Sequence, residues 1–421
     1  MNHPVDVIVV GAGHAGLCVS YYLAKHEIGH IVFEQGRIGE TWRSQRWDSF
    51  KMNSANKLNL LPEQAVYFDD PDAFVFANEF ASSLKNYSKQ LSLPVKEYCK
   101  VLDITKDEKE NIFLVNVSEV GEERTYCSRQ VVVASGGQNK IHVPTFAENI
   151  SKSILQLHTS EYKNSNQLSQ GDVLVVGSAQ SGIQVAEDLV RAGKKVFLST
   201  SKVGRIPRSY RGMDIFDWLL QIGFYDVYTE DIIDVSLLKT KNPQVSGFGD
   251  RGKTSSLQSL ARSGVVILGR AESADLKRIF FQRNAALHVR YADEYSQKVK
   301  GMIDEHIRAN SQPIPVGEID PDDIPDEHAD CASDLAEINF DDNNIKSIIW
   351  TTGFVSDFSY LKLPVLNEDK MPRHRHGISE VKGLYFIGLS WLRKRKSPII
   401  LGISEDAEFI VDQILESGRR S

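Results

Sequence analysis

The sequence predicts an α/β fold in which one strand–helix–strand unit occurs twice. An apolar, β-branched run at Val5–Val10 leads into the glycine motif GAGHAG of residues 11–16, and a helical stretch follows to about Lys25. The same order returns where a strand at Val173–Val176 leads into the motif GSAQSG of residues 177–182 and a second helix. Short, continuous apolar runs of this kind are typical of strands buried inside a parallel sheet.

The two units also agree in length. From Gly11 to Glu34, and from Gly177 to Thr200, 23 residues separate the first glycine from the end of the second strand. A glycine-rich turn between a strand and a helix, with this spacing, is typical of Rossmann-like dinucleotide-binding domains. The repeat therefore predicts two dinucleotide sites in one chain.

Other segments lie between and after the two units. Alternating polar and apolar residues predict a small sheet from Lys96–Thr105, Ile112–Glu119 and Arg124–Val133. Further helices are expected at Met213–Ile222, Ala292–Asn310 and Glu405–Glu416, further strands at Gly264–Gly269, Lys346–Trp350 and Leu384–Ile387, and linkers at residues 145–170 and 311–330.

The order of these segments predicts that one domain is inserted into another. We expect a discontinuous first domain, residues 1–165 and 326–421, and a second domain at residues 166–325. The least regular stretch of the second domain, residues 205–260, is expected to form a lid-like insertion.

The composition excludes several classes of function. The 421 residues carry a formal charge of −7, so no general basic field attracts nucleic acid or an anionic membrane. We find no signal-peptide pattern and no run of the about 20 apolar residues that span a bilayer. The four cysteines form no close pair, which argues against a disulfide framework, a redox pair and a zinc site. Cytoplasm is the expected compartment, and a homodimer is left open.

Each glycine of the first motif has its own task. Gly11 permits the tight turn, Gly13 lets the backbone approach a pyrophosphate, and Gly16 allows the helix to pack on the strand. Glu34, followed by Gln35, ends the second strand, where a carboxylate can accept both hydroxyls of a ribose. These residues predict a dinucleotide site, with a glycine turn that binds no ligand as the alternative.

The segment Gly39–Arg43 favours FAD as the ligand of the first site. Its sequence, GETWR, places a glycine turn, Trp42 and Arg43 just beyond the second strand. An aromatic ring and an arginine there can wrap the phosphates and ribityl chain of a long cofactor. An ordinary surface turn is the alternative.

The second motif departs from the usual pattern at its middle glycine. Ala179 stands there, and its methyl group lies where the backbone should approach the pyrophosphate, so we expect weakened rather than lost binding. The residues expected to contact the second dinucleotide in this motif are Gly177, Ser178, Gln180 and Ser181.

The end of the following strand favours NADPH. No acid stands there, and Ser199 and Thr200 are followed by Lys202 and Arg205. Hydroxyls and cations accept a 2′-phosphate, which an acid would repel. NADH is the alternative if these cations only belong to a solvated loop.

A set of motifs in a fixed order extends the argument beyond nucleotide binding. GAGHAG, GETWR, RWDSFKMN, VVVASGG, the second glycine motif, IIWTTGF and LYFIGLSW span nearly the whole chain. In this order they resemble class B flavoprotein monooxygenases, the family of flavin-containing monooxygenases, plant YUCCA-type enzymes and Baeyer–Villiger enzymes. The C-terminal motifs are most similar to those of bacterial flavoproteins of this family.

The resemblance implies further contacts to FAD. The family has an alanine-threonine-glycine turn, which this chain matches as Ala134-Ser135-Gly136 with serine in place of threonine. The later turn Thr351-Thr352-Gly353 is its counterpart. The segment that leads into the closing helix is expected to face the flavin ring. The implied residues are Ser135, Gly136, Thr352, Gly353, Gly388 and Ser397.

The resemblance also implies an activity. The family oxygenates small molecules with dioxygen and NAD(P)H through a C4a-(hydro)peroxyflavin, and a nitrogen or sulfur centre is the expected target. Asn53, in RWDSFKMN, matches the family asparagine beside the flavin, where a neutral amide can donate and accept hydrogen bonds without titrating. A simple turn residue is the alternative for Asn53.

One family fingerprint is only half present. His158 and Tyr162 match the pattern Phe-x-Gly-x-x-x-His-x-x-x-Tyr, whereas Lys152 and Ile154 replace its first aromatic residue and its glycine. The loss favours, as an alternative, an NAD(P)H oxidase or reductase that releases hydrogen peroxide. A Baeyer–Villiger enzyme is a variant of the monooxygenase hypothesis, although the family's Baeyer–Villiger members usually end this fingerprint in tryptophan. Ala179 and the lid-like segment prompt a third alternative, a non-catalytic flavin sensor. The histidine is expected either to couple domain motion or simply to pack in the linker.

The basic run Arg393–Lys396 contrasts with the acidic chain around it. A solvated loop is the favoured interpretation, and a cationic lip near the flavin or an anionic substrate is the second. A nuclear or nucleic-acid-binding patch is disfavoured by the rest of the sequence.

Overall fold

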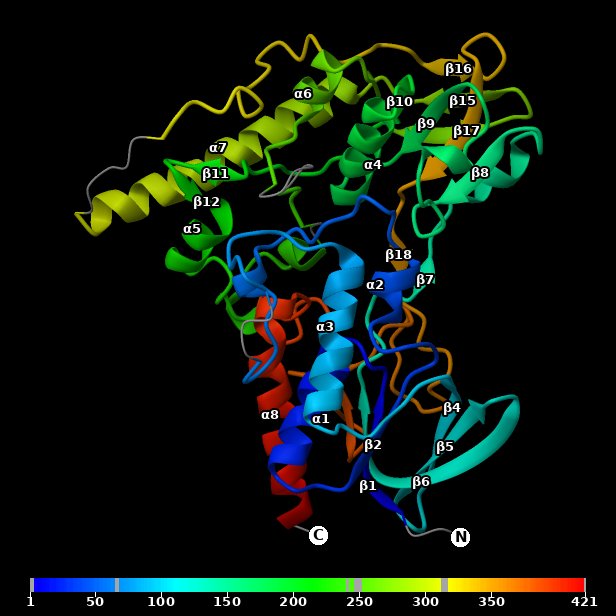
Figure 1. Ribbon diagram of the computed structural model, residues 1–421, viewed down its shortest axis with the longest axis vertical. Coiled ribbons are helices and arrows are strands. Elements are labelled where there is room, and N and C mark those ends of the chain that lie inside the picture. The colour runs from blue at the N-terminus through cyan, green and yellow to red at the C-terminus, as the bar shows by residue number, and fades with distance from the viewer. Residues whose placement is uncertain (1–3, 65–67, 240–241, 246–251, 312–316, 420–421) are drawn as a thin grey trace.

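The structure is a computed structural model that describes residues 4–64, 68–239, 242–245, 252–311 and 317–419. Two α/β parts lie one above the other in Figure 1, and the middle of the sequence forms the upper part. The predicted fold class, with one dinucleotide-binding domain inserted into another, is confirmed.

The lower part is built on a sheet whose parallel strands follow the order β3-β2-β1-β6-β21. These strands are Val95–Lys96 (β3), His30–Phe33 (β2), Val5–Val10 (β1), Glu122–Val133 (β6) and Leu384–Phe386 (β21). Antiparallel strands extend it at Cys99–Asp107 (β4), Ile112–Glu119 (β5), His374–Arg375 (β19) and Ile378–Ser379 (β20). Helices pack on it at His14–Lys25 (α1), Ala77–Gln90 (α3) and Ile400–Arg419 (α8).

Strand β1 lies in the middle of this sheet, which explains its sequence. Val7, Ile8 and Val9 are fully buried, because β2 and β6 flank the strand and helices cover it. A strand that is buried on both faces has no polar face, so its sequence is continuously apolar.

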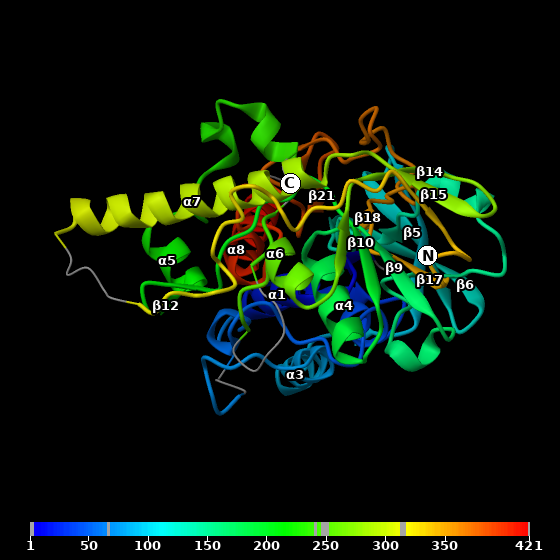
Figure 2. The same ribbon diagram turned by 90° about the horizontal axis from the view of Figure 1, so that it is seen from above.

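The upper part repeats this plan, with parallel strands in the order β13-β10-β9-β17-β8. They are Val266–Leu268 (β13), Val196–Ser199 (β10), Asp172–Val176 (β9), Ile345–Trp350 (β17) and Leu155–His158 (β8). An antiparallel sheet of Ala271–Ala274 (β14), Arg278–Phe281 (β15) and Glu337–Asn339 (β16) lies beside it. The helices are Gln180–Arg191 (α4), Ile215–Gln221 (α5), Leu257–Arg262 (α6) and Ala285–Ala309 (α7), and Figure 2 shows α7 reaching far beyond the sheet.

The chain passes between the two parts at one place. Lys140–Ile141 (β7) leaves the lower part, Phe354–Val355 (β18) returns to it, and these two strands pair antiparallel. The predicted boundaries after residues 165 and 325 are therefore wrong, because β8 and β17 belong to the upper sheet. The strand β17 was predicted, but β8 has only four residues and pairs with a segment about 190 residues away, so the sequence near it does not show to which sheet the two strands belong.

Most predicted elements are present with shifted ends. The expected linker at residues 145–170 contains β8, α7 begins at Ala285 rather than Ala292, and α8 begins at Ile400 rather than Glu405. Parts of the predicted lid and of the second linker, residues 240–241, 246–251 and 312–316, lie outside the described residues. Among the helices that the structure describes, none has both the length and the apolar character needed to cross a membrane.

Candidate functional site

Close backbone contacts shape the first glycine motif. Gly11 has φ +105°, and a Cβ atom there would lie 2.7 Å from the carbonyl oxygen of Ala134. On Gly16 a Cβ atom would lie 1.9 Å from the carbonyl oxygen of Gly11, so only glycine lets α1 approach β1. A Cβ atom on Gly13 would meet no described atom within 4 Å. The space in front of Gly13, at the start of α1, fits a pyrophosphate.

Glu34 connects the end of β2 to the glycine turn. Its Oε2 accepts a hydrogen bond from the N–H of Ala12 at 2.8 Å, and its Oε1 accepts one from Gly36 at 2.9 Å. Burial raises the pKa of this carboxyl group, and the two N–H donors oppose that rise. A carboxylate has about four acceptor positions, so two are left for the hydroxyls of a ribose. Gln35, the next residue, is exposed.

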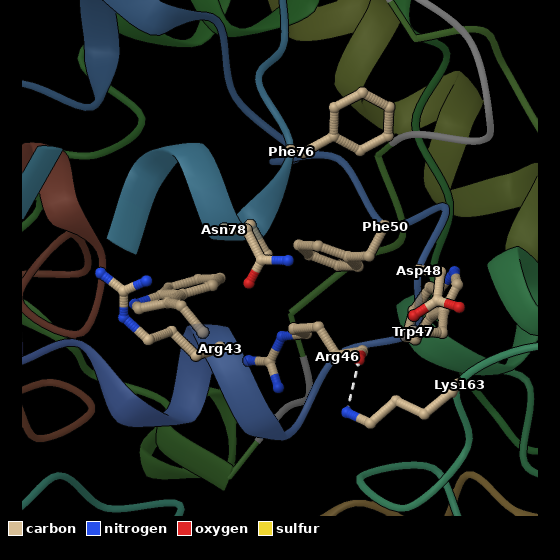
Figure 3. Close-up of a pocket in the computed structure, with 10 residues that line it drawn as sticks. Arg43, Arg46, Trp47, Asp48, Phe50, Phe76, Asn78 and Lys163 are labelled. Carbon is tan, nitrogen blue, oxygen red and sulfur yellow. Dashed lines mark hydrogen bonds between the residues drawn. The ribbon is translucent and has the colours of Figure 1, made fainter. Parts of the chain in front are cut away.

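A pocket of about 130 Å³ lies between α2 (Glu40–Ser44) and the start of α3 (Figure 3). Trp42 and Arg43 of the predicted FAD site line it. Arg46, which the sequence analysis missed, lines it too, with its guanidinium 4.9 Å from the centre of the Trp42 ring. Burial lowers the pKa of Arg46 to about 10, so it is still charged near neutral pH. The sequence signal for it is a second arginine three residues after Arg43.

The two predicted turns lie in different parts of the molecule. Ser135 and Gly136 follow β6 beside the first glycine motif, and the Ser135 hydroxyl lies 2.7 Å from the hydroxyl of Tyr360. Thr352 and Gly353 follow β17 and therefore lie beside the second motif instead of the first. Their assignment to FAD is corrected, because β17 is a strand of the upper sheet.

Gly388 follows β21 and lies against the first helix. Its φ is +76°, and a Cβ atom there would lie 3.4 Å from the Cβ of Ala15 in α1. The chain thus turns closely over the start of α1, next to the space in front of Gly13.

Ser397 is turned into the protein. It is fully buried, its hydroxyl accepts hydrogen bonds from the N–H groups of Arg393 and Lys394 at 3.1 Å, and its own N–H donates to the carbonyl of Lys394. Its polar groups therefore hold the loop before α8, and a direct contact of this side chain to flavin is not supported.

The basic run Arg393–Lys396 is a contact between the two parts of the molecule. Lys394 and Lys396 form ion pairs with Asp226 of the upper part and with Glu405 of α8. The guanidinium of Arg395 lies 4.0 Å from the centre of the Phe224 ring. The favoured prediction of a solvated loop is wrong, because the side chains of Lys394 and Lys396 are only 14% and 10% exposed and are paired with acids.

The second glycine motif has the same backbone as the first. Gly177 has φ +113°, and a Cβ atom there would lie 2.6 Å from the carbonyl oxygen of Thr351, while one on Gly182 would lie 1.9 Å from that of Gly177. Ala179 precedes α4 with φ −74° and ψ −174°, and Gly13 precedes α1 with φ −76° and ψ −174°. The alanine therefore causes no backbone strain, and its methyl group takes up space that Gly13 leaves open.

The motif's polar side chains already have protein partners. The hydroxyl of Ser178 accepts the N–H of Ser201 at 2.9 Å, and the Oε1 of Gln180 accepts the N–H of Val245 at 2.9 Å. Ser181, in the first turn of α4, is partly exposed. Any contact to a dinucleotide must add to these bonds or replace them.

The hydroxyls at the end of β10 point into the protein. Ser199 donates to the carbonyl of Gly269 at 3.0 Å, and the Thr200 hydroxyl bonds to the carbonyl of Leu268 and to Nδ1 of His288. Each of the two residues is 1% exposed, so the prediction that they accept a 2′-phosphate is not supported. Lys202 is exposed, with its ammonium 4.6 Å from the centre of the Tyr291 ring.

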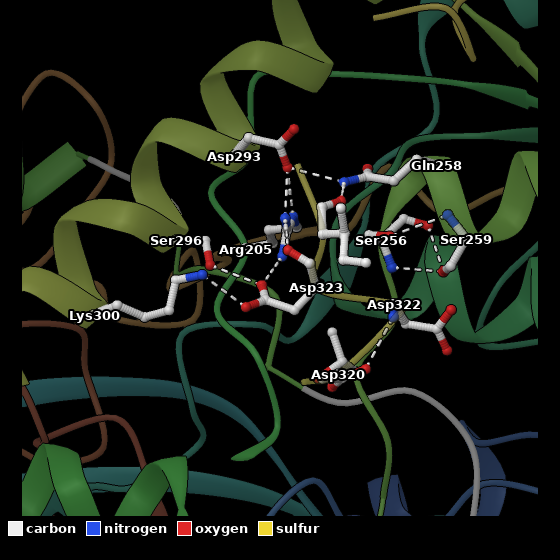
Figure 4. A network of polar contacts seen from close by, with 12 residues as sticks. Arg205, Ser256, Gln258, Ser259, Asp293, Ser296, Lys300, Asp320, Asp322 and Asp323 are labelled. Atoms are coloured by element: carbon white, nitrogen blue, oxygen red, sulfur yellow. Dashed lines mark hydrogen bonds and ion pairs between the residues drawn. The ribbon is translucent and has the colours of Figure 1, made fainter. Parts of the chain in front are cut away.

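Arg205 is also removed from the predicted phosphate site. It is 1% exposed, and its guanidinium is bonded to the carboxylates of Asp293 and Asp323 (Figure 4). Lys300 completes the network through a contact of 2.8 Å to Asp323. Because carboxylates from α7 and from the later linker both bind its guanidinium, Arg205 stabilises the upper part and is not free to bind a phosphate.

Asn53 lies where the two parts meet. Its Oδ1 accepts a hydrogen bond of 3.0 Å from Nε2 of Gln184 in α4, and its carbonyl accepts one of 2.8 Å from Arg208. Nearby, Asp188 of α4 accepts hydrogen bonds from Ser49 at 2.6 Å and from Tyr162 at 2.7 Å. The segment around Asn53 is thus fixed against the helix that follows the second glycine motif.

His158 is fixed where the chain crosses between the parts. Its Nε2 lies 3.0 Å from the carbonyl oxygen of Gly353, and its Nδ1 lies 2.8 Å from the hydroxyl of Ser160. It is buried, and burial lowers its pKa. The histidine therefore joins β8 to the returning segment, as a packed residue of the crossing.

The chain was compared with known proteins. A family model described as pyridine nucleotide-disulphide oxidoreductase matches residues 8–211. A CzcO-like oxidoreductase of Geobacillus kaustophilus is 31% identical over 99% of each chain. Indole-3-pyruvate monooxygenase YUCCA8 of Oryza sativa subsp. japonica is 27% identical over 50% of this chain and 51% of its own.

Solved structures share the fold at low identity. A flavin-containing monooxygenase from Stenotrophomonas maltophilia superposes with a TM-score of 0.66 at 16% identity over 98% of both chains. Bacillithiol disulfide reductase from Bacillus cereus gives 0.60 at 15% identity, covering 99% of this chain and 100% of its own. OTEMO, solved with FAD and NADP, gives 0.56 at 12% identity, covering 99% of this chain and 86% of its own.

The chain belongs to the family of CzcO-like oxidoreductases. The predicted enzyme class, an oxidoreductase, is therefore confirmed. The similarity to YUCCA8 and to the flavin-containing monooxygenase structure agrees with the predicted resemblance. The predicted cofactors, FAD and NADP, are those of the OTEMO structure. The free cysteines of this chain are Cys18, Cys99, Cys127 and Cys331.

Proposed function

We propose that the protein uses FAD and NADPH to transfer one oxygen atom of dioxygen to a nitrogen or sulfur atom of a small molecule. The observation that best supports this is the junction of the two units, where Asn53 of the lower part is bonded to Gln184 of the upper part. A hydride donor held by the second unit would reach a flavin held by the first at this junction.

The lower part would hold FAD through its first unit. The open space in front of Gly13 suits the pyrophosphate, and the free acceptor positions of Glu34 suit the ribose. Arg43 and Arg46 supply positive charge near the same turn. When bound and reduced, FAD supplies the activation of dioxygen.

Two exposed cations favour NADPH over NADH at the second unit. Lys202 follows β10 and Arg270 follows β13, so both lie at the carboxyl ends of neighbouring parallel strands. Burial, then Arg270, then Lys202 lower the pKa of His288 to about 4, so both cations act on the same place. A 2′-phosphate placed there would meet two positive charges.

Asn53 would contribute a hydrogen-bonding group that does not titrate. Its amide can donate a hydrogen bond near the flavin without delivering a proton. Arg208 is 4% exposed and fixes the backbone of Asn53, which keeps the amide in place for oxygen transfer.

Turnover under labelled dioxygen tests the proposal. Purified protein, NADPH and a panel of amines and sulfides should give a product that contains one labelled oxygen atom. An Asn53→Ala variant should consume NADPH with less product and more hydrogen peroxide. A product that carries no label, or no product from any substrate, contradicts the proposal.

An NAD(P)H oxidase or reductase is the second candidate. It is supported by the incomplete fingerprint, in which Lys152 is exposed where the family has an aromatic residue. Hydrogen peroxide equal to the NADPH consumed, with every substrate offered, identifies this activity. Ketones in the same panel separate a Baeyer–Villiger reaction from nitrogen or sulfur oxygenation.

A further inference from the structure

Gln184 has a buried acceptor without a partner. The residue is 9% exposed, and its Nε2 donates to Asn53, but within the described part of the chain its Oε1 meets no hydrogen-bond donor. Buried side-chain oxygens are satisfied in most native structures, so an unsatisfied one needs an explanation. A ligand that brings an N–H group is one such explanation.

Asn53 offers the opposite group beside it. Its Oδ1 is used by Gln184, so its Nδ2 group is left as a donor, and no hydrogen bond joins this nitrogen to a described residue. Asn53 is only partly buried, and Arg208 holds its backbone carbonyl, so the amide is accessible and fixed. The hydrogen bond between the two side chains thus leaves one unused acceptor on Gln184 and one unused donor on Asn53.

An amide group is complementary to this pair. It carries an N–H donor and a carbonyl acceptor next to each other. Gln184 lies two residues after Gly182 of the second unit, and Asn53 belongs to the first part, so the pair lies between the two predicted cofactors. Both cofactors bring such an edge, as the carboxamide of nicotinamide or the pyrimidine edge of flavin.

We propose that Gln184 and Asn53 together form a receptor for the amide edge of a bound cofactor. The Oε1 of Gln184 accepts an N–H of this edge, and the Nδ2 of Asn53 donates to its carbonyl. Gln184 also positions Asn53, because its Nε2 occupies the Asn53 oxygen and leaves the nitrogen free. The inference rests on the proposed function, and it adds a residue that the family motifs did not indicate.

A change on the protein and a change on the ligand test the receptor together. Gln184→Met keeps the length of the side chain and removes its hydrogen bonds. The acetylpyridine analogue of NADP+ replaces the carboxamide NH2 by a methyl group. Wild-type protein should bind NADP+ about 5- to 10-fold more tightly than the analogue, the effect of one hydrogen bond, and Gln184→Met should bind the two equally. The dissociation constants are measured by titrating the flavin absorbance, without turnover.

Ser49→Ala is the matched control. It removes a hydrogen bond between the same two segments, from Ser49 to Asp188, but does not touch Gln184 or Asn53. Its preference for NADP+ over the analogue should equal that of the wild type. Thermal unfolding of all variants shows that they are folded.

The possible outcomes distinguish FAD from NADP+ as the ligand of the receptor. They also distinguish a failure of the receptor from a failure of the proposed function. If Gln184→Met changes FAD retention and leaves NADP+ binding unchanged, the pyrimidine edge of flavin occupies the receptor. If it changes neither in a wild type that binds both cofactors, the receptor does not exist. If the wild type itself binds no FAD or NADP+, the proposed function fails first.

Discussion

The first βαβ unit ends its second strand with Glu34, and the second unit ends the equivalent strand with Thr200. Their backbones are alike: in each, a Cβ atom on the third glycine would lie 1.9 Å from the carbonyl oxygen of the first. Their side chains differ, because Glu34 has acceptor positions left for a ligand, whereas Thr200 is bonded to Leu268 and His288.

The difference shows which parts of such a unit are fixed by packing and which by the ligand. Glycines that contact neighbouring backbone are the same in both copies, because any side chain would collide. The position that faces open space is glycine in one copy, Gly13, and alanine in the other, Ala179. Variation is therefore expected where a cofactor, and not the protein, fills the space.

The largest effect is expected from a methyl group on a packed glycine. Gly16→Ala should destabilise the lower part by about 3 kcal/mol or more and give protein without flavin, because α1 can no longer approach β1. Gly182→Ala should leave flavin bound and abolish NADP+ binding. Flavin content by absorbance and NADP+ titration check both. Equal loss of flavin in the two variants would contradict the division into two sites.

Stability should depend on pH in opposite directions for the groups at the ends of β10 and β2, which are His288, bonded to Thr200, and Glu34. Burial lowers the pKa of His288 from 6.5 to about 4, so between these values the unfolded chain binds more protons, and stability falls as the pH falls. His288→Gln should remove up to about 3 kcal/mol of this loss. The pKa of Glu34 is raised, so Glu34→Gln should change the slope in the opposite direction. Denaturant unfolding of the wild type and both variants between pH 4 and 7 measures how the free energy of unfolding depends on pH. A change of the same sign in the two variants would contradict the pKa directions given for His288 and Glu34.

Charge reversal tests the choice of nicotinamide. Lys202→Glu should lower kcat/KM for NADPH by about 10- to 50-fold and leave NADH nearly unchanged, because a charged hydrogen bond to the 2′-phosphate is lost. Arg205→Lys serves as a contrast, since its guanidinium is internal: it should lower the unfolding temperature and keep the preference for NADPH. A loss that is equal for both nucleotides would place the 2′-phosphate elsewhere.

The smallest effect is expected at the position that differs between the motifs. Ala179→Gly should tighten NADP+ binding about 2- to 5-fold, because the methyl group no longer occupies the approach to the pyrophosphate. Stability should change little, since glycine is tolerated before a helix. Gly13→Ala is the reciprocal change and should weaken FAD. Isothermal titration measures the first and flavin release the second, and weaker NADP+ binding by Ala179→Gly would show that the methyl group contributes a contact.

Local stereochemistry could be predicted from the sequence. Gly16 packs on Gly11 and Gly182 on Gly177, and Glu34 bonds to Ala12, so these features depend on neighbours within one βαβ unit and their signal is local in the sequence. The alanine-serine-glycine turn was predicted only from the family resemblance, because Ala134 lies 123 residues from Gly11, against which it packs.

Contacts between distant segments could not be predicted. Arg205 was expected to bind phosphate, but Asp293 and Asp323 bind it, and they lie 88 and 118 residues further along the chain. The cations of residues 393–396 were expected in solvent partly for the same reason, because Asp226, which pairs with Lys394, lies 168 residues earlier. Gln184 has no signal of its own, since its importance comes from Asn53, which lies 131 residues earlier.

The pairing of β7 with β18 has a consequence for how such a chain could arise. Because the outgoing and returning strands are hydrogen-bonded neighbours, their ends are only about 5 Å apart. A two-residue hairpin turn could join them directly. The segment between β7 and β18 could therefore be inserted or removed at this one point without breaking a strand pairing of the lower sheet.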